Sequence, residues 1–512
     1  MRSLLVLLLL SSGLWVSSSA ATPPLSAKAS NDRPNILLIY TDDQGYGDAS
    51  CLNPKAKFTT PNQDRLAREG MTFTDAHCSD TVCTPSRYGL LTGRYSWRTT
   101  LKRGVFGAER ACLITDGRVT LASFLRDHGY HTGMVGKWHL GMDFPGTQGK
   151  RDWSKPVQDM PLDKGFDYFW GIPASMNYGV LAWFEGRHAA VPPTQWTKKK
   201  PNKIALSDYR IMPPYEMKQG PNLMEVAPDF IDDQCLTRFT NQALKWIAGK
   251  AEDARKGKPF FLYLPYTSPH KPVIPIEKFR GQGQAGAYGE FMIETDWHLG
   301  RLLDLLDREK LTENTMVIFT SDNGPETTWK QRIEKYSHHS AGPFREGKRS
   351  IYEGGHRVPF FIRWPAKVTP GSTWDLPVCQ TDLLSTFASI LKKPLPENAA
   401  EDSISFDQAW WERKVSSPPR PPLIHHAANG RFAIRYEEWK LVMEGTRKTE
   451  KRELYDLGRD PGEKNNVLTQ HPDVEKKLLG QLNAIITRGA TRAAAGSRND
   501  TPPWKDLVWF KD

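Results

Sequence analysis

Short runs of consecutive apolar residues alternate, up to about residue 400, with segments in which apolar residues recur every three or four positions. Uniformly apolar runs are typical of strands buried on both faces of a parallel sheet, and the longer spacing is typical of helices. The runs predict strands at 35–40, 131–135, 259–264, 316–320 and 358–362. Spacing and capping residues predict helices at 61–69, 231–248, 299–306 and 382–391. This alternation predicts an α/β fold with a large, mainly parallel central sheet covered by helices.

The pattern changes after about residue 400. Three short runs, at 432–435, 439–442 and 454–457, predict antiparallel strands, and a helix is expected from Val474 to Thr487. We therefore expect a large domain over residues 33–400 and a smaller C-terminal α+β domain over residues 401–512.

The first twenty residues have the layout of a secretory signal peptide. Arg2 precedes an apolar run that continues to Val16, and Ser18 and Ala20 occupy the −3 and −1 positions of a cleavage site. The apolar run is too short to span a bilayer comfortably, which favours cleavage over a membrane anchor. We expect residues 1–20 to be removed and residues 21–32 to form a flexible lead. The mature protein should be secreted, periplasmic or otherwise exported, without stable membrane insertion.

The net charge and the number of cysteines exclude some classes of function. The formal net charge of +11 favours an anionic substrate or surface. The most compact basic stretch is only Lys198–Lys200, so nucleic-acid binding is not expected. The six cysteines are too few for a disulfide scaffold in 512 residues, and they show no CxxC metal spacing.

Charged and metal-binding side chains follow four of the predicted strands. They are Asp42 and Asp43, Lys137 and His139, His270, and Asp322 with Asn323. Ligands of open α/β sheets bind beyond the carboxyl ends of the strands, so we expect these side chains to share one edge. The acidic pair and the Asp-Asn pair offer only oxygen ligands, which suit a hard divalent cation and would suit zinc less well. We expect Ca²⁺ rather than Mg²⁺.

The most specific segment is Cys83-Thr84-Pro85-Ser86-Arg87 with Leu91-Thr92-Gly93-Arg94 downstream. It resembles the signature of the type I, formylglycine-dependent sulfatases, in which a maturation enzyme oxidises the cysteine to formylglycine. The resemblance extends over roughly Pro34 to Asn466, and Gly171–Ser175 is most similar to the arylsulfatase A branch. It implies an alkaline phosphatase-like fold and sulfate-ester hydrolysis. A hydroxyl of the aldehyde hydrate attacks sulfur, and deprotonation of the second hydroxyl releases sulfate.

The resemblance also implies a role for each site residue. The modified Cys83 is the nucleophile, Arg87 steadies the hydrate, His139 is the base in sulfate release, and His270 donates a proton to the leaving oxygen. Lys137 and Lys348 bind the sulfate, and Ser175 contacts it. The cation ligands are Asp42, Asp43, Asp322 and Asn323 together with the modified Cys83.

Two other functions remain open from the sequence. A phosphonate or phosphodiester hydrolase would share the fold, although such relatives commonly bind two zinc ions with additional histidines. A non-catalytic protein that binds sulfated glycans would require Cys83 to remain a thiol. For the substrate we expect terminal sugars of sulfated glycans, and aryl sulfates. The aromatic rings of Trp153, Trp170, Trp183 and Trp196 could stack on sugars, although core packing or lid formation would also explain them.

Overall fold

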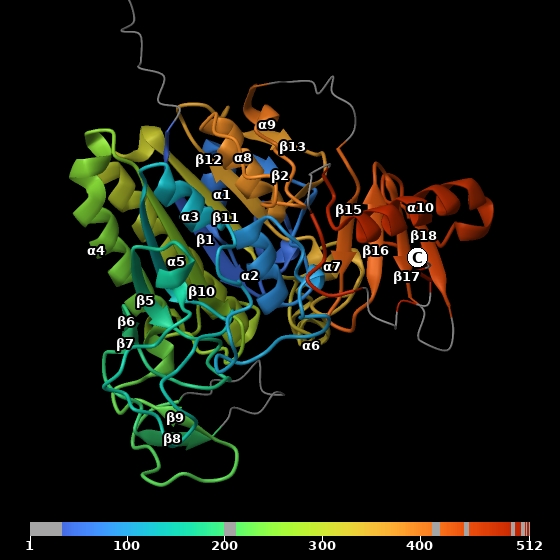
Figure 1. The fold of residues 1–512 in the computed structure, drawn as a ribbon. Coiled ribbons are helices and arrows are strands. Elements are labelled where there is room, and N and C mark those ends of the chain that lie inside the picture. The colour runs from blue at the N-terminus through green and yellow to red at the C-terminus, as the bar shows by residue number, and fades with distance from the viewer. Residues whose placement is uncertain are drawn as a thin grey trace, which may run out of the picture.

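The computed structural model describes residues 33–198, 211–411, 420–444, 450–492, 497–502, 507 and 509–510. The predicted signal peptide (1–20) and flexible lead (21–32) lie outside the described residues. Within the described ranges, no helix is both long and apolar enough to cross a membrane. The chain forms a large body around one central sheet, with a smaller antiparallel sheet beside it (Figure 1).

The central sheet has ten strands in the order β13-β2-β12-β11-β1-β10-β4-β5-β6-β7. Five neighbouring strands at its centre, β11, β1, β10, β4 and β5, are parallel, whereas β12, β6 and β7 pair antiparallel. All five predicted strands are present, and the sheet is mainly parallel as predicted. Its strands are β1 (Asn35–Asp42), β2 (Met71–Phe73), β4 (His131–Lys137), β5 (Tyr168–Ile172), β6 (Phe184–Glu185), β7 (His188–Ala189), β10 (Phe260–Pro269), β11 (Thr315–Ser321), β12 (Phe360–Arg363) and β13 (Ser372–Trp374).

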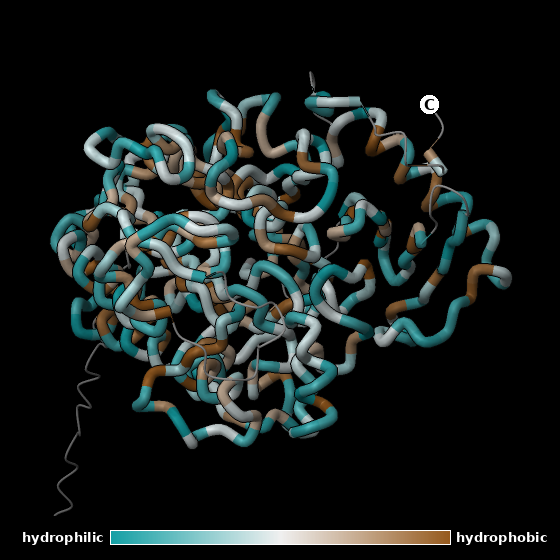
Figure 2. The backbone as a smooth tube through the Cα atoms, turned by 90° about the horizontal axis from the view of Figure 1, so that it is seen from below, coloured by the Kyte–Doolittle hydropathy of each residue, from teal (hydrophilic) through white to brown (hydrophobic). Residues whose placement is uncertain are grey.

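Both faces of this sheet are covered. Every residue of β1, β10 and β11 is buried, and successive side chains of a strand point to opposite faces. One group of contacting helices consists of α1 (Pro61–Glu69), α4 (Cys235–Arg255) and α5 (Gly286–Arg308). Another consists of α2 (Cys83–Thr92), α3 (Leu121–Asp127) and α8 (Leu383–Ile390). The four predicted helices correspond to α1, α4, α5 and α8. Hydrophilic stretches run along the outer loops (Figure 2).

The C-terminal part is a four-stranded antiparallel sheet with a helix against it. Its elements are β15 (Leu423–His426), β16 (Phe432–Tyr436), β17 (Trp439–Met443), β18 (Arg452–Asp456) and α10 (Pro472–Arg488). The sequence predicted all of these except β15, whose two consecutive histidines hide the apolar pattern of a buried strand. The core of this part includes Tyr95 and Trp97, and conversely Phe406 and Trp410 pack into the large core. The two parts therefore interlock, and the boundary at residue 400 stays a prediction.

Smaller elements lie in the connecting loops. The paired strands β8 (Gln195–Lys198) and β9 (Leu223–Val226) extend from the large body at the bottom of Figure 1. The smaller elements also include β3 (Ala76–His77), which pairs with β14 (Val378–Cys379), and the short helices α6 (Trp329–Tyr336), α7 (Glu353–His356) and α9 (Gln408–Trp411).

A buried acid–base pair lies inside α5. The Oε1 atom of Glu294 and the Nε2 atom of His298 are 3.7 Å apart, and both side chains are fully buried. Burial raises the pKa of Glu294 to about 8 and lowers that of His298 to about 3. Both groups are therefore uncharged near neutral pH. A carboxyl with a raised pKa destabilises the folded state progressively as the pH rises from its unfolded pKa to its folded one.

We expect Glu294→Gln to reduce this pH dependence. Between about pH 4.5 and 8, the difference between the free energy of unfolding of the variant and that of the wild type should increase in favour of the variant, by about 1.4 kcal/mol for each pH unit. The opposing effect of His298 ends at its unfolded pKa near 6.5, so the wild type itself should lose stability most clearly above that pH. Urea unfolding at pH 5, 6.5 and 8 measures this difference. Parallel pH profiles for the two proteins would show that Glu294 is not held neutral.

Candidate active site

The strand-end residues meet at one edge of the central sheet. Asp42 is the last residue of β1 and Lys137 the last of β4, while His270 directly follows β10 and Asp322 directly follows β11. Asp43 and His139 have positive φ angles of 70° and 63°. Such angles are uncommon outside glycine and often occur at functional sites. The complete set of predicted site residues is buried, with none more than 5% exposed: Asp42, Asp43, Cys83, Arg87, Lys137, His139, Ser175, His270, Asp322, Asn323 and Lys348.

Hydrogen bonds join the two acidic segments directly. The backbone N–H of Asp43 donates to Oδ1 of Asp322 at 3.1 Å, and Nδ2 of Asn323 donates to Oδ1 of Asp43 at 2.7 Å. Arg87 donates from Nε and Nη2 to Oδ2 of Asp322, at 3.1 and 2.8 Å. Arg87 also donates to the backbone carbonyl of Lys137 at 3.1 Å. One guanidinium from α2 thus links the ends of β4 and β11.

Two lysines neutralise the remaining carboxylates. Nζ of Lys137 lies 2.5 Å from Oδ2 of Asp42, and Nζ of Lys348 lies 2.5 Å from Oδ1 of Asp43. Burial acts to raise the pKa of Asp42, but neighbouring cationic groups, led by Lys137, outweigh it and hold that pKa well below its ordinary value. Burial, together with the charge of Asp42, raises the pKa of Asp322 to about 7. The site is therefore a dense group of opposite charges shielded from solvent.

The acidic residues fit a hard divalent cation. Oδ1 of Asp42, Oδ2 of Asp43 and Oδ1 of Asn323 are buried and have no hydrogen-bond partner. One oxygen each of Asp42 and Asp322 and the Sγ atom of Cys83 lie within 4.8 Å of one another. Buried oxygens without partners are costly, and hard cations such as Ca²⁺ and Mg²⁺ bind this type of oxygen. The donor set therefore agrees with the oxygen-liganded cation expected from the sequence.

Cys83 is the first residue of α2 and is 2% exposed. Pro85 lies at the third position of α2, whose N-cap is Val82. A proline is tolerated there because N–H groups of the first helical turn have no partner within the helix. Burial raises the pKa of the Cys83 thiol, although Lys137 and Lys348 act in the opposite direction. An unmodified Cys83 would therefore be a protonated, weakly nucleophilic thiol at neutral pH.

The two site histidines are held in defined orientations. Nε2 of His139 lies 2.9 Å from the carbonyl oxygen of Phe106, and Nδ1 of His270 lies 2.6 Å from that of Lys271. Since a carbonyl only accepts, each of these ring nitrogens carries the proton, and the other nitrogen has a free lone pair at neutral pH. Burial lowers the pKa of His139 well below its ordinary value, with the charges of Lys137 and Arg87 adding to the effect. Burial lowers that of His270 to about 4.

The loop after β5 brings Ser175 to the same place. The backbone N–H of His139 donates to the carbonyl of Pro173 at 2.8 Å, and Oγ of Ser175 is buried without a hydrogen-bond partner. The same loop contributes Tyr178, whose ring centroid lies 5.3 Å from that of His139. The sequence did not suggest Tyr178, because nothing in its local pattern marks it.

Glu326 is a second residue that the sequence missed. Its carboxylate forms a two-pronged ion pair with Arg349 and lies 4.0 Å from Nζ of Lys348. Only the folded chain brings this carboxylate next to Lys348.

The tryptophans between residues 152 and 222 serve mainly in packing. Trp183 and Trp196 are only 1% and 7% exposed. Trp170 stacks on Trp183 with ring centroids 5.4 Å apart, and the guanidinium of Arg238 covers Trp183. The suggestion that these rings present faces to sugars is wrong for Trp183 and Trp196, because their rings are buried.

A second buried cluster combines three histidines with one glutamate. Its members are His77, His356, His425 and Glu353. The ammonium group of Lys440 lies within it, 2.9 Å from Oε1 of Glu353 and 3.1 Å from Nε2 of His356. It also lies 2.8 Å from Oε1 of Glu463. Lys440 therefore supplies the positive charge of this cluster, which joins α7 to the C-terminal sheet.

Comparisons with known proteins agree with this geometry. A family model described as Sulfatase matches residues 34–393, and one described as N-sulphoglucosamine sulphohydrolase, C-terminal, matches residues 344–488. The chain is 34% identical to an N-acetylgalactosamine-6-O-sulfatase of Bacteroides thetaiotaomicron, over 90% of this chain and 94% of that protein. It is 32% identical to arylsulfatase A of Homo sapiens, over 90% and 91% of the two chains.

A solved structure shows the same likeness in three dimensions. It is a Bacteroides thetaiotaomicron protein described in connection with the metabolism of multiple glycosaminoglycans. It matches with a TM-score of 0.77 and 32% identity, over 89% of this chain and 100% of that one. The chain therefore belongs to the type I sulfatase family, in the branch similar to arylsulfatase A, and is a sulfuric ester hydrolase.

Proposed function

We propose that this sulfatase is exported and that Cys83, matured to formylglycine, is its nucleophile. The observation that carries the proposal is the meeting of Cys83 with the acidic strand ends and two lysines in one buried site. The raised pKa of the thiol argues against an unmodified cysteine as the attacking group. The hydrated aldehyde supplies one hydroxyl for attack and a second whose deprotonation releases sulfate. Maturation requires a formylglycine-generating enzyme as a partner.

The cation in this proposal is Ca²⁺ rather than Mg²⁺. Asp42, Asp43, Asp322 and Asn323, with the modified Cys83, would hold it, and it would polarise a sulfate oxygen. The buried oxygens that lack hydrogen-bond partners support this assignment.

Four side chains hold the sulfate group and the nucleophile. The ammonium groups of Lys137 and Lys348 stabilise the negative charge that the sulfate brings into a site shielded from water. Ser175 donates its unpartnered hydroxyl to a sulfate oxygen. Arg87, fixed by Asp322 and by the Lys137 carbonyl, orients the nucleophile one helical turn away.

Two histidines move the protons. His139 presents the lone pair of Nδ1, which suits the base that takes a proton during sulfate release. His270 presents Nε2 towards the site, 3.8 Å from Oδ2 of Asp43. Its pKa of about 4 rises when an anionic sulfate ester binds beside it, because a nearby negative charge favours the protonated ring. The protonated ring then donates to the leaving oxygen.

The proposed substrates are terminal sugars of sulfated glycans, and aryl sulfates. The names of relatives, an N-acetylgalactosamine-6-O-sulfatase and an arylsulfatase A, support both classes. The burial of every sulfate-binding residue suits a terminal group that enters a pocket and not a polymer that lies along a groove. The signal-like N-terminus, outside the described residues, supports export.

The matured protein should release inorganic sulfate from a small aryl sulfate and from oligosaccharides sulfated on the terminal sugar. Internal sulfate of a long polysaccharide should be released far more slowly. The rate on the corresponding aryl phosphate and phosphodiester should be at least about 10²-fold lower, because the described side chains around Cys83 offer one oxygen-rich cation site, whereas two-metal phosphoryl transfer uses a pair of sites. Ion chromatography of released sulfate and phosphate gives all of these rates.

Each arm of this experiment can contradict one part of the proposal. A phosphodiester rate above the sulfate rate would favour the phosphohydrolase alternative. Binding of sulfated glycans without turnover, in protein whose formylglycine is verified by mass spectrometry, would favour a binding protein. Equal release of internal and terminal sulfate would contradict the pocket.

A further inference from the structure

Helix α2, which carries Cys83, is held at its N-terminal end by the C-terminal sheet. Its N-cap, Val82, provides no side-chain cap. The buried residue Asp80 lies two residues before this N-cap, and its Oδ1 accepts the backbone N–H of Thr81 at 2.7 Å. The carbonyl of Asp80 also accepts the hydroxyl of Ser86 from the first turn of α2, at 2.8 Å. Asp80 therefore contacts both the residue before the N-cap and the first turn of α2.

His426, the last residue of β15, binds the other oxygen of this carboxylate. Its Nδ1 lies 2.5 Å from Oδ2 of Asp80, and both side chains are buried. Two residues further along, the backbone N–H of Ala428 donates to the hydroxyl of Thr81 at 3.1 Å. Residues far apart in the sequence thus fix Asp80 and Thr81, the residues just before Cys83 and its N-cap.

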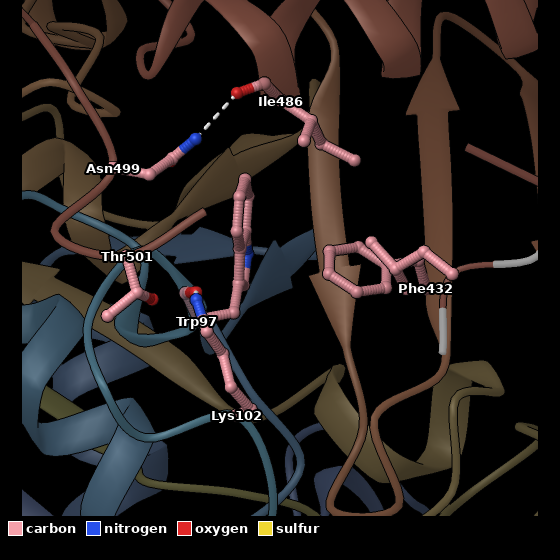
Figure 3. Close-up of a pocket in the computed structure, with 7 residues that line it drawn as sticks. Trp97, Lys102, Phe432, Ile486, Asn499 and Thr501 are labelled. Atoms are coloured by element: carbon pink, nitrogen blue, oxygen red, sulfur yellow. Dashed lines mark hydrogen bonds between the residues drawn. The ribbon is translucent and has the colours of Figure 1, made fainter. Parts of the chain in front are cut away.

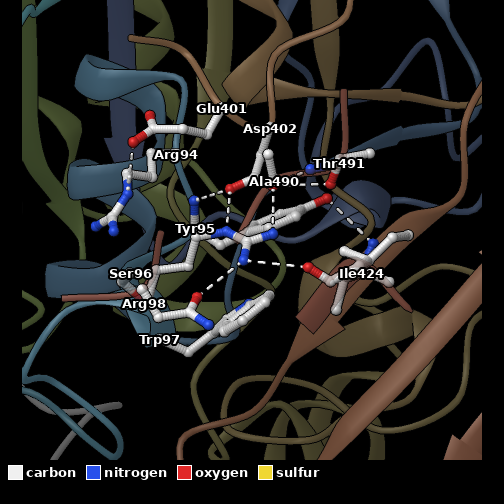
Figure 4. Close-up of polar contacts among 12 residues, drawn as sticks. Arg94, Tyr95, Ser96, Trp97, Arg98, Glu401, Asp402, Ile424, Ala490 and Thr491 are labelled. Carbon is white, nitrogen blue, oxygen red and sulfur yellow. Dashed lines mark hydrogen bonds and ion pairs between the residues drawn. The ribbon is translucent and has the colours of Figure 1, made fainter. Parts of the chain in front are cut away.

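The segment that follows α2 is held by residues 401–402 and by β15. Arg94 pairs with Glu401 at 3.0 Å, and Arg98 pairs with Asp402 at 2.8 Å (Figure 4). Asp402 also accepts the N–H of Tyr95, and the hydroxyl of Tyr95 accepts the N–H of Ile424 in β15.

Trp97 completes this attachment. Its indole lines a pocket together with Phe432 of β16 and Ile486 of α10 (Figure 3). Its ring centroid is 5.2 Å from that of Phe432, which in turn lies 5.0 Å from the ring of His426. Strands β15 and β16 therefore reach both ends of the segment that presents Cys83.

We propose that His426 is a positioning residue of this sulfatase: through Asp80 it sets the first turn of α2 and therefore the place of Cys83. The proposal rests on the proposed role of Cys83 as the nucleophile. Without the His426 contact, Asp80 is left with a buried oxygen lacking a partner, and the turn relaxes to satisfy it. A shift of about 1 Å in a reacting group can lower a rate by about 10²-fold.

The test compares His426→Ala, His426→Asn and His425→Ala. Asparagine can place its amide nitrogen close to Nδ1 of the histidine, so it should restore the bond to Asp80. His425 precedes His426 in β15, is equally buried and stacks on His356, so it controls for general damage to the sheet. We expect kcat on an aryl sulfate, per formylglycine counted by mass spectrometry, to fall about 10- to 100-fold in His426→Ala with little change in KM. His426→Asn should recover most of it, and His425→Ala should keep wild-type kcat.

A second measurement does not depend on turnover. In protein made without maturation, the rate at which iodoacetamide alkylates Cys83 should rise at least about threefold in His426→Ala and stay at the wild-type value in His425→Ala. If His426→Ala does not fold, His426→Gln replaces it, since its amide nitrogen reaches the position of Nε2 and not that of Nδ1.

The outcomes separate the two proposals. Wild-type kcat and wild-type alkylation in a folded His426→Ala would overturn the positioning role, as would equal losses in His425→Ala. Absence of turnover in fully matured wild type would overturn the proposed function, and the alkylation rates would still decide whether His426 positions Cys83.

Discussion

Replacement of Cys83 by alanine should abolish sulfate-ester hydrolysis and leave the fold intact. The loss should be at least about 10³-fold, because the covalent route disappears while the charges that bind sulfate remain. The truncation removes one atom at the start of α2, which costs on the order of 1 kcal/mol of folding free energy. Initial rates on an aryl sulfate, together with circular dichroism and thermal unfolding, measure the two effects.

Two further variants sharpen this result. Cys83→Ser should be almost as inactive in a host that matures only cysteine, because a serine hydroxyl lacks the second hydroxyl that expels sulfate. Cys51→Ala removes an exposed cysteine outside the site and should keep wild-type activity. Sustained multiple turnover by Cys83→Ala would contradict the mechanism.

The core of the fold could be predicted from the sequence because its strands are uniformly apolar. The stretches 36–39 and 316–319 contain no polar residue and are buried on both faces in β1 and β11, as expected for strands in the interior of a parallel sheet. The direction of each strand was harder to predict from the sequence. The run that became β12 pairs antiparallel with β11, and nothing in its four residues encodes that direction.

The site could be predicted only as far as each residue belongs to a local pattern. Asp42, Lys137, His270 and Asp322 follow apolar runs, so their strand ends place them at one edge. The pairing of Lys137 with Asp42 depends on how neighbouring strands lie, which the sequence does not show.

The contact between Asp80, just before α2, and His426 of β15 could not be predicted from the sequence for the same reason. Asp80 and His426 are 346 residues apart, and β15 itself was missed. A contact between two unremarkable sequence positions can be found only after both segments are folded.

The second large effect should come from Asp322→Asn. Asparagine keeps the shape of the side chain and an oxygen that can accept the N–H of Asp43. It removes one of the three carboxylate charges available to the cation, and it leaves the buried Arg87 without its closest ionic partner. Loss of one anionic ligand weakens a hard-cation site, and the buried guanidinium, left with the more distant Asp42 at 3.8 Å, repels the cation further.

We therefore expect the purified Asp322→Asn variant to contain less than about 0.1 calcium per chain where the wild type keeps about one, with activity lower by about 10³-fold. Elemental analysis after dialysis at a fixed free-calcium concentration measures the first effect, and aryl sulfate turnover the second. Asp304→Asn is the matched control, because Asp304 is exposed and contacts Arg65 only weakly at 3.4 Å. Stoichiometric zinc in active wild type would contradict the oxygen-liganded cation. Retention of both calcium and activity in Asp322→Asn would remove Asp322 from its ligands.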